Sequence, residues 1–248
     1  MRNIIKNFSC IDWKIEEKTD FPHRIVTACD ENFEIGAAIL IRSVNVFHNC
    51  KIDVYHLGSP SWEFQRLCYG CNADIILDKP DFEYRGRGWQ TFGKPGYVRK
   101  SLIREERLMW LDSDCIVCNY LDDVCFPLWT DHGYHVPTHE TSWPGEQSPN
   151  AGVFAVSKDD MDFISIWKDA CDAAADNEPN ALPYQDQGIL DKLLPKDTQL
   201  VDGRIWTDFH NFRSGNSDPN RFIRSVFNRD STVVHLGDRS RPWQKWEW

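Results

Sequence analysis

The region from residue 24 to residue 111 constrains the fold most, because short apolar runs alternate there with segments of helical spacing. Four of the runs have the length and composition of strands, and the segments between them are long enough for helices. We predict strands at Arg24–Cys29, Lys51–Leu57, Ala73–Leu77 and Arg107–Leu111, and helices at Asp30–Phe47, Ser61–Cys71 and Tyr97–Glu106. Strands that alternate with helices indicate a parallel sheet with crossover helices. The predicted fold class is therefore α/β, with a mostly parallel central sheet flanked by helices.

Asp112 and Asp114 directly follow the fourth predicted strand. Ligands of open α/β sheets bind beyond the carboxyl ends of the strands, so this position suits a binding site. Residues two apart in an extended segment point the same way, so both carboxylates can reach one hard cation, which can neutralise a diphosphate. With 26 aspartates in 248 residues, about three Asp-x-Asp triplets are expected by chance. We interpret Asp160–Asp162 as one of these, and the first pair gains weight only from its place at a strand end.

The composition limits the partners of the chain. It has 38 acidic and 28 basic residues and a formal net charge of −10. Nucleic acids and anionic membranes select basic surfaces, so neither is expected as a main partner. No apolar run approaches the ~18 residues that span a bilayer, and the N-terminus lacks the apolar core of a signal peptide, so we expect a soluble cytoplasmic protein. The nine cysteines indicate reduced thiols rather than disulfides or a paired zinc site.

The second half of the chain has fewer regular patterns. An apolar strand at Val153–Val156 precedes a capping box of Ser157 and Asp160, which predicts the start of a helix. The apolar face expected on that helix consists of Phe163, Ile166, Trp167, Ala170 and Ala174. A helix at 184–194 and a strand at Thr232–Leu236 follow. The chain contains no internal repeat, so we expect one domain.

Five motifs between residues 25 and 243 occur together in an order known from one family. They are Ile25–Asp30 (IVTACD), Trp110–Asp114 (WLDSD), Asn150–Val153 (NAGV), Asp186–Leu190 (DQGIL) and His235–Gly237 with Arg241–Trp243 (HLG and RPW). On these motifs the chain resembles the nucleotide-sugar glycosyltransferases of the GT-A (Rossmann-like) fold. The resemblance is strongest to glycosyltransferase family 8, which includes glycogenin-like and lipopolysaccharide galactosyltransferase-like enzymes. Each motif is weak alone, but five in order are specific.

The resemblance implies a metal centre with Asp112, Asp114 and His235 as ligands. Two carboxylates and one imidazole suit Mn²⁺ better than Ca²⁺, with Mg²⁺ as a substitute. The cation would act as a Lewis acid that stabilises the leaving nucleoside diphosphate. The resemblance places the nucleotide against Thr27, Ala28, Asp30, Ser113, Gly237 and Arg241. Asp30 has an alternative role as a helix N-cap.

The same resemblance assigns the sugar-binding and catalytic residues. The donor sugar or the acceptor would be bound by Asn150, Ala151, Asp186 and either Arg99 or Lys100, between which the sequence does not decide. Asp186 and Gln187 are the expected catalytic residues, with Gln187 near the anomeric carbon. A glutamine is not a strong base, which fits a transfer with retention of configuration. An inverting route would need a carboxylate base, for which Glu140 and Asp186 are the candidates.

The resemblance thus implies an enzyme, and we expect a metal-dependent hexosyltransferase that transfers a hexose from a UDP-sugar to a hydroxyl of a glycan, lipid-linked or protein acceptor. The expected domain comprises an N-terminal extension at 1–23, a nucleotide-binding half at 24–115 and an acceptor-binding half at 116–248. One alternative, a sugar-1-phosphate nucleotidyltransferase, would need a glycine-rich phosphate loop and a lysine where the sequence has Asp30–Phe33. The other is a catalytically silent protein that binds sugar nucleotides or serves as a scaffold, which would not need the intact site residues.

Overall fold

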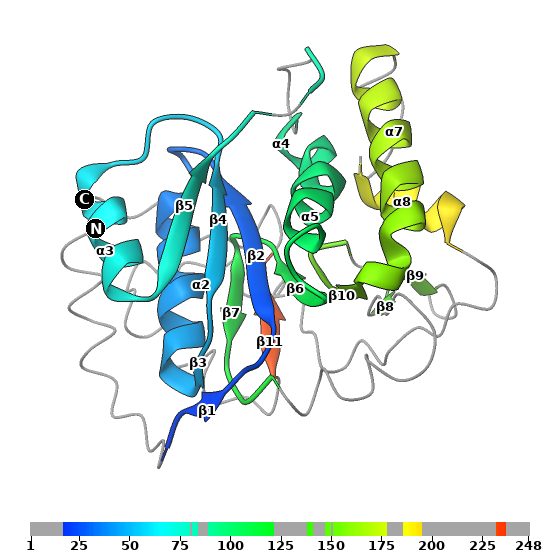
Figure 1. Ribbon diagram of the computed structural model, residues 1–248. Helices are drawn as coiled ribbons and strands as arrows, with labels where there is room; N and C mark the ends of the chain where they lie inside the picture. The colour runs from blue at the N-terminus through cyan, green and yellow to red at the C-terminus, as the bar shows by residue number, and fades with distance from the viewer. Residues whose placement is uncertain are drawn as a thin grey trace.

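The computed structural model has a central five-stranded sheet with helices on both faces (Figure 1). It describes residues 17–79, 81–83, 89–121, 151–177, 186–194 and 232–236, and the backbone alone of 138–140 and 147–149. The strands are β2 (Arg24–Cys29), β4 (Ile52–His56), β5 (Ala73–Leu77), β6 (Arg107–Leu111) and β10 (Val153–Ser157). Their order is β10-β6-β2-β4-β5, and all are parallel except β10, which is antiparallel to β6. The predicted α/β class with a mostly parallel sheet is confirmed.

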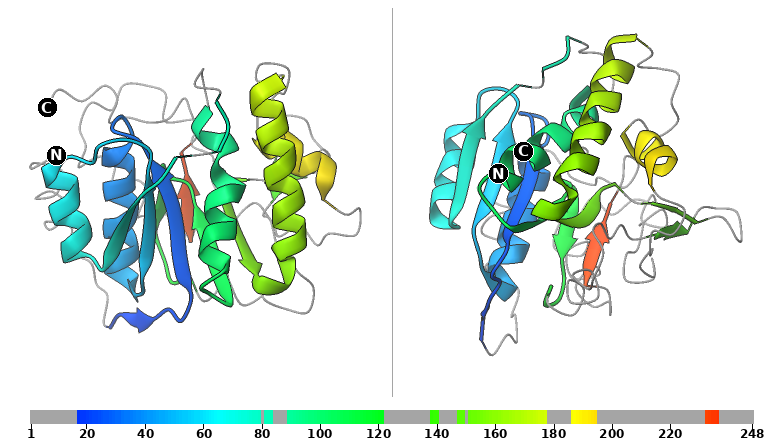
Figure 2. Two further views of the ribbon diagram at one scale, coloured as in Figure 1. Left: turned by 45° about the horizontal axis from the view of Figure 1, so that its top comes forward. Right: turned by 45° about the vertical axis from the view of Figure 1, so that its right-hand side comes forward.

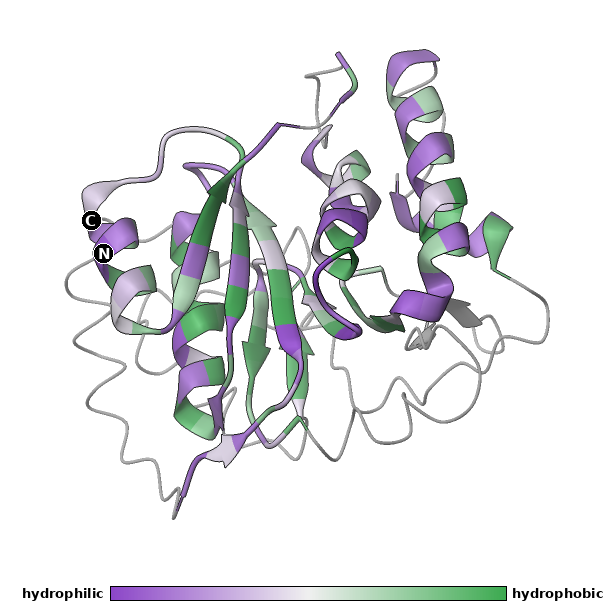
Figure 3. Ribbon diagram, viewed as in Figure 1, coloured by the Kyte–Doolittle hydropathy of each residue, from purple (hydrophilic) through white to green (hydrophobic). Residues whose placement is uncertain are grey.

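Two layers of helices cover the sheet, and Figure 2 shows them in two further views. The helices are α2 (Glu34–Phe47), α3 (Trp62–Gly70), α4 (Trp89–Phe92), α5 (Lys94–Leu102), α7 (Met161–Asn177) and α8 (Asp186–Leu193), with a 3-10 turn η1 (Lys158–Asp160). Side chains alternate along a strand. On β2, Ile25 and Cys29 therefore pack in the core with α2 and α3, and Val26 packs in the core with α5 and α7. The strands are largely hydrophobic (Figure 3), as is typical of a parallel sheet covered on both faces, although β5 is partly exposed.

Three further strand pairs lie outside the central sheet in the described part of the chain. β1 (Thr19–Asp20) is parallel to β3 (His48–Asn49), and β8 (Thr138–Glu140) is antiparallel to β9 (Gln147–Pro149). β7 (Cys115–Val117) is antiparallel to β11 (Val233–His235). β7 follows β6 closely, so this last pair brings a distant segment to the carboxyl edge of the central sheet. Within the described residues, the helices are too short or too polar to cross a lipid bilayer.

The predicted elements agree with the structure most closely at the strands, since β2, β5 and β6 have the predicted bounds. The start of α5 lies at Lys94, three residues before its predicted start, because Pro95 fits the first turn of a helix. The capping box of Ser157 and Asp160 is confirmed. On α7 the predicted apolar face is wrong at Ile166, which is 56% exposed. The buried face consists of Ile164, Trp167, Cys171 and Ala175, and the predicted Phe163, Ala170 and Ala174 are partly buried beside it.

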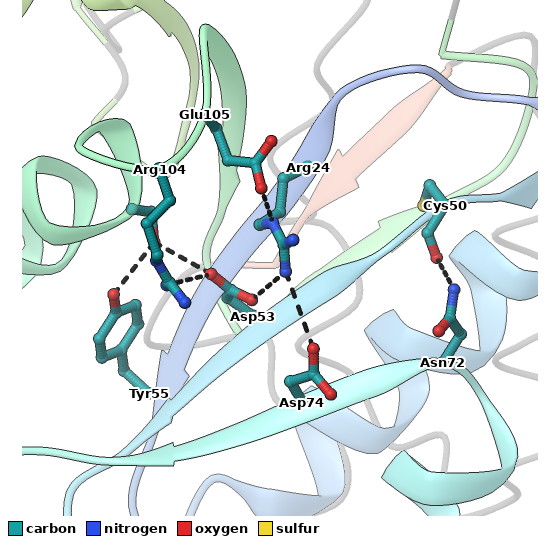
Figure 4. A network of polar contacts seen from close by, with 9 residues as sticks. Arg24, Cys50, Asp53, Tyr55, Asn72, Asp74, Arg104 and Glu105 are labelled. Carbon is teal, nitrogen blue, oxygen red and sulfur yellow. Dashed lines mark hydrogen bonds and ion pairs between the residues drawn. The ribbon is translucent and has the colours of Figure 1, made fainter.

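The amino-terminal edge of the sheet holds a network of ion pairs (Figure 4). Asp53 on β4 is fully buried, and its carboxylate lies 2.6 Å from Arg24 Nη1 and 2.9 Å from Arg104 Nη2. Ser101 Oγ donates to the same carboxylate at 3.2 Å. The Arg24 guanidinium also binds Glu105 Oε1 through Nε at 2.7 Å. The buried charge at this edge is thus paired by charges of the chain itself, as a buried carboxylate requires.

The seven cysteines among the described residues are buried, and none of the seven forms a disulfide. Burial raises the pKa of the Cys50 and Cys68 thiols to about 12. A thiol with such a pKa is protonated at neutral pH and unreactive. These residues therefore behave as small apolar side chains of the core, as the sequence indicates.

Candidate active site

The carboxyl edge of the sheet brings together residues that are far apart in the sequence. After β6, a turn closed by the bond from Cys115 N to Asp112 O (2.9 Å) leads into β7. β11 pairs with β7 so that His235 lies opposite Cys115. The bond from Leu236 N to Asp114 O (3.1 Å) continues this pairing into the turn. Backbone pairing over a long sequence distance therefore places the imidazole beside the two aspartates.

The three residues expected to bind a metal meet in this way. His235 Nε2 lies 3.2 Å from Asp114 Oδ1 and 3.6 Å from Asp112 Oδ2. Burial lowers the pKa of His235, but Asp114 and then Asp112 outweigh this effect and raise the pKa overall. The two carboxylates thus favour a positive charge between them.

Cys115 lies beside this group but faces the core. Its Sγ, an Asp114 oxygen and a ring nitrogen of His235 lie within 4.8 Å of one another. The thiol is fully buried and lies 3.7 Å from Gly152 O, to which it donates. We therefore take the two carboxylates and the imidazole as the candidate ligands and Cys115 as a packing residue.

Gly152, of the NAGV motif, is required by the position of His235. A Cβ atom built on Gly152 would overlap the imidazole and lie 2.6 Å from its Nδ1 atom. Gly152 O also accepts a hydrogen bond from Asp112 N at 2.7 Å. A side chain at this position would therefore displace His235 from the aspartates.

Lys94 is a central residue of the site that the sequence patterns did not indicate. Its Nζ lies 3.0 Å from Asp112 Oδ1 and 2.8 Å from Asp186 Oδ2, and donates to Ala151 O at 2.7 Å. The residue is 4% exposed. Burial lowers the pKa of Lys94, but Asp112 and Asp186 raise it above its usual value, so the ammonium stays charged. The available signal was Pro95, which marks the first turn of α5 and would place Lys94 at the carboxyl edge.

Arg99 and Lys100, between which the sequence did not decide, lie in the last turn of α5. Arg99 is exposed, and its Nε donates to Ser165 Oγ on α7 at 3.1 Å. Lys100 Nζ forms an ion pair with Asp78 at 2.6 Å. The helix rises about 1.5 Å per residue, so the last turn lies about 8 Å from Lys94. The structure therefore groups Lys94, rather than either of these two residues, with the site aspartates.

Asp186 and Gln187 begin α8 at the same edge. Asp186 is 4% exposed, and burial raises the pKa of its carboxyl although Lys94 opposes the rise. The Thr91 side chain of α4 also forms a hydrogen bond with this carboxylate. Gln187 Oε1 accepts from Ala151 N at 3.3 Å. Ala151 is thus held through both backbone groups, by Gln187 at its N–H and by Lys94 at its carbonyl.

Asp30 lies at the end of β2 and is 7% exposed. One carboxylate oxygen accepts from Asn32 N at 3.0 Å in the turn before α2. The N-cap of that helix is Phe33, and no side chain caps it, so the N-cap role expected as an alternative for Asp30 is wrong. The other oxygen accepts from Gln90 Nε2 of α4 at 2.9 Å.

Thr27 is fully buried, and its hydroxyl has no hydrogen-bond partner among the described residues. Ala28 is half-buried on the opposite face of the strand.

The remaining expected residues are placed only in part. Ser113 is 9% exposed and lies in the turn between the two aspartates. Asn150, Gly237 and Arg241 lie outside the described residues. Glu140 lies in β8, of which the structure describes the backbone alone.

Several solved structures that are similar to this chain are glycosyltransferases. The galactosyltransferase LgtC, in complex with donor and acceptor sugar analogues, is similar with a TM-score of 0.62 and 19% identity over 89% of each chain. The glycosyltransferase GlyE of Streptococcus pneumoniae is similar with a TM-score of 0.62 and 17% identity. That match covers 94% of this chain, which spans 58% of the length of the GlyE chain. The chain has the GT-A fold.

More distant structures share the fold as well. Mouse xyloside xylosyltransferase 1 is similar with a TM-score of 0.57 and 11% identity, over 90% of this chain and 99% of its own. No protein-family model matches the sequence, and no curated protein is significantly similar to it. Similarity at identities this low shows the fold alone, and we therefore infer the function from the residues at the carboxyl edge.

Proposed function

We propose that this protein is a glycosyltransferase that moves a hexose from a UDP-sugar to an acceptor hydroxyl, with Mn²⁺ as cofactor and with retention of configuration. The observation that carries the proposal is the meeting of Asp112, Asp114 and His235 at the carboxyl edge of a GT-A sheet. The alternatives do not require a carboxylate pair joined by a distant histidine.

The donor atoms at this position fit a hard divalent cation. Two carboxylates and one imidazole nitrogen are the ligand set that Mn²⁺ accepts, with Mg²⁺ as a substitute. Asp112, Asp114 and His235 would hold the ion, and Gly152 leaves the room that the imidazole needs. When bound, the cation supplies Lewis-acid stabilisation of the leaving diphosphate.

The nucleoside would lie against the end of β2. The Asp30 carboxylate can accept from ribose hydroxyls or from a base N–H, and Gln90 fixes its orientation. Thr27 is buried, so we assign its contribution to the backbone at the strand end. Ser113 lies between the metal-binding aspartates, and we assign Gly237 and Arg241 to the phosphates, where an arginine can form charge-assisted bonds.

The donor sugar would lie between β6 and α8. Asp186 can accept from sugar hydroxyls, and Lys94 neutralises this carboxylate and Asp112 together. Asn150 and Ala151 would border the sugar, since Ala151 is held by Lys94 and Gln187. The acceptor would be a glycan, a lipid-linked group or a protein. The acceptor sugar analogue bound to LgtC supports a sugar hydroxyl as the attacked group.

Retention is supported by the pairing of the carboxylates in the described part of the site. Asp186 is paired with Lys94 at 2.8 Å, and Asp114 with His235 at 3.2 Å. A base for an inverting transfer needs a carboxylate free to take the acceptor proton. We therefore assign that proton to the departing phosphate on the same face of the sugar and place Gln187 near the anomeric carbon. A structure of LgtC carries a glutamine-to-glutamate substitution in its active site, which supports a glutamine there.

The test is a screen of UDP- and GDP-sugars with Mn²⁺, read as transfer to sugar acceptors or as slow hydrolysis of the donor. We expect turnover of a UDP-hexose that EDTA abolishes and that is lost in Asp114→Ala. NMR of the product should show the anomeric configuration of the donor. Turnover that is independent of metal would contradict the proposed site. UDP binding without turnover of any donor would instead support the catalytically silent protein.

A further inference from the structure

Trp110, on β6, directs its indole N–H at a candidate metal ligand. The residue is 2% exposed, and its Nε1 atom donates to Asp112 Oδ1 at 2.6 Å. The two residues are two apart at the end of a strand, so their side chains lie on the same face of the sheet. A hydrogen bond this short to an ionised carboxylate is among the strong ones in proteins.

The indole itself is held from two sides. Phe154 on β10 lies directly opposite Trp110 in the strand register, and their rings stack with centroids 6.2 Å apart and planes 13° apart. Lys94 Nζ lies 5.7 Å from the centroid of the indole, within the range of a cation–π contact. The N–H direction is therefore fixed by packing before any ligand binds.

The two oxygens of Asp112 share Lys94 and differ in their other neighbour. Oδ1 accepts from Trp110 and lies 3.0 Å from Lys94 Nζ. Oδ2 accepts from Lys94 Nζ at 3.3 Å and lies on the side of His235, 3.6 Å from its Nε2 atom. Lys94 cannot hold Asp112 alone, because the same ammonium also binds Asp186 and Ala151 O.

We propose that Trp110 is a positioning residue, which fixes Asp112 Oδ1 so that Oδ2 faces the cation beside Asp114 and His235. The inference rests on the proposed function, because it needs the cation at this place. Groups that hold metal ligands by hydrogen bonds typically contribute about 10- to 100-fold to metal affinity, because they fix the ligand in its binding orientation.

Trp110→Phe removes the N–H and keeps an aromatic ring between Phe154 and Lys94. We expect Mn²⁺ to bind about 10- to 100-fold more weakly in the presence of UDP, measured by electron paramagnetic resonance of the free ion. Trp167→Phe is the matched control. Trp167 is 1% exposed, packs edge-to-face on the same Phe154, and donates its N–H to the backbone oxygen of Asp186 at 3.2 Å. It loses an equally buried indole hydrogen bond, but not one to a metal ligand, so its Mn²⁺ affinity should stay that of the wild type.

The outcomes separate this inference from the proposed function. If the wild type does not bind Mn²⁺ with UDP, the proposed metal site fails. If the wild type binds and Trp110→Phe binds equally well, or if both tryptophan variants lose affinity to the same extent, the role of Trp110 is overturned and the metal site stands. Thermal unfolding checks that the variants fold. Should Trp110→Phe not fold, Phe154→Leu, which loosens the indole but keeps its N–H, should bind Mn²⁺ several-fold more weakly, and unchanged affinity would again overturn the inference.

Discussion

The two edges of the central sheet both bury aspartates, but they balance the charge in different ways. At the amino-terminal edge, two arginines pair directly with Asp53 and Glu105 at 2.6–2.9 Å. At the carboxyl edge, three aspartates share Lys94 and His235. Among the residues that the structure describes, the first network is complete without a ligand, whereas the second gathers more carboxylates than permanently charged groups to neutralise them. We infer that the first edge stabilises the fold, and the proposed function requires the second edge to bind a cation.

The largest expected effect is on activity at the carboxyl edge. Asp114→Ala should reduce kcat/KM by about 1000-fold or more, because Lewis-acid stabilisation of the leaving group contributes several kcal/mol. Its free energy of unfolding should fall by less than about 1 kcal/mol, because one of the competing carboxylates is removed. Steady-state kinetics and urea unfolding measure the two quantities, with Asp159→Ala, at an exposed residue of η1, as control. Equal losses of activity in both variants would contradict a specific catalytic role for the carboxyl edge.

The opposite edge should respond in stability alone. Asp53→Asn leaves Arg24 without its buried partner, and breaking such a pair costs about 3 kcal/mol of unfolding free energy. The lower end of the usual range applies because the Arg104 side chain is 52% exposed. Urea unfolding measures the loss, and kcat/KM per folded molecule should stay unchanged. A variant of normal stability but low activity would show that this network serves the site.

Lys94 and Arg99 both lie on α5, but only Lys94 contacts the site aspartates. Lys94→Met should lower kcat/KM by about 100-fold, because a buried charged hydrogen bond contributes about 1.5–3 kcal/mol. Arg99→Met, on the exposed side of the same helix, should change kcat/KM by less than about threefold. Steady-state kinetics with the same donor compare the two. A larger loss of kcat/KM in Arg99→Met than in Lys94→Met would indicate that the donor is bound by the last turn of α5.

The smallest effect concerns the room that His235 occupies. Gly152→Ala should weaken Mn²⁺ binding by about 10-fold, since its Cβ would displace the imidazole from the aspartates. Gly70→Ala is the control, because a Cβ there meets no atom within 4 Å. Calorimetric titration of Mn²⁺ in the presence of UDP measures both affinities. An unchanged affinity in Gly152→Ala would mean that His235 does not ligate the ion.

The sequence predicts the regular parts of this molecule well and the contacts between distant parts less well. β2, β5 and β6 follow directly from apolar runs bounded by polar residues. Asp112 and Asp114 stand out because they follow such a run. Lys94 does not, because its role depends on the start of α5 and on Asp186, which is close only in space. The sequence gives no sign of the hydrogen bond from Trp110 to Asp112 either, because a buried tryptophan in a strand is an ordinary core residue.

The central claim is that Asp112, Asp114 and His235 hold one divalent cation at the carboxyl edge of the sheet. Crystals grown with Mn²⁺ and UDP, measured on both sides of the manganese absorption edge, test it directly. We expect one anomalous peak at this edge, in contact with oxygens of both aspartates and with His235 Nε2. A peak elsewhere, or UDP bound at this edge without a peak beside His235, would contradict it.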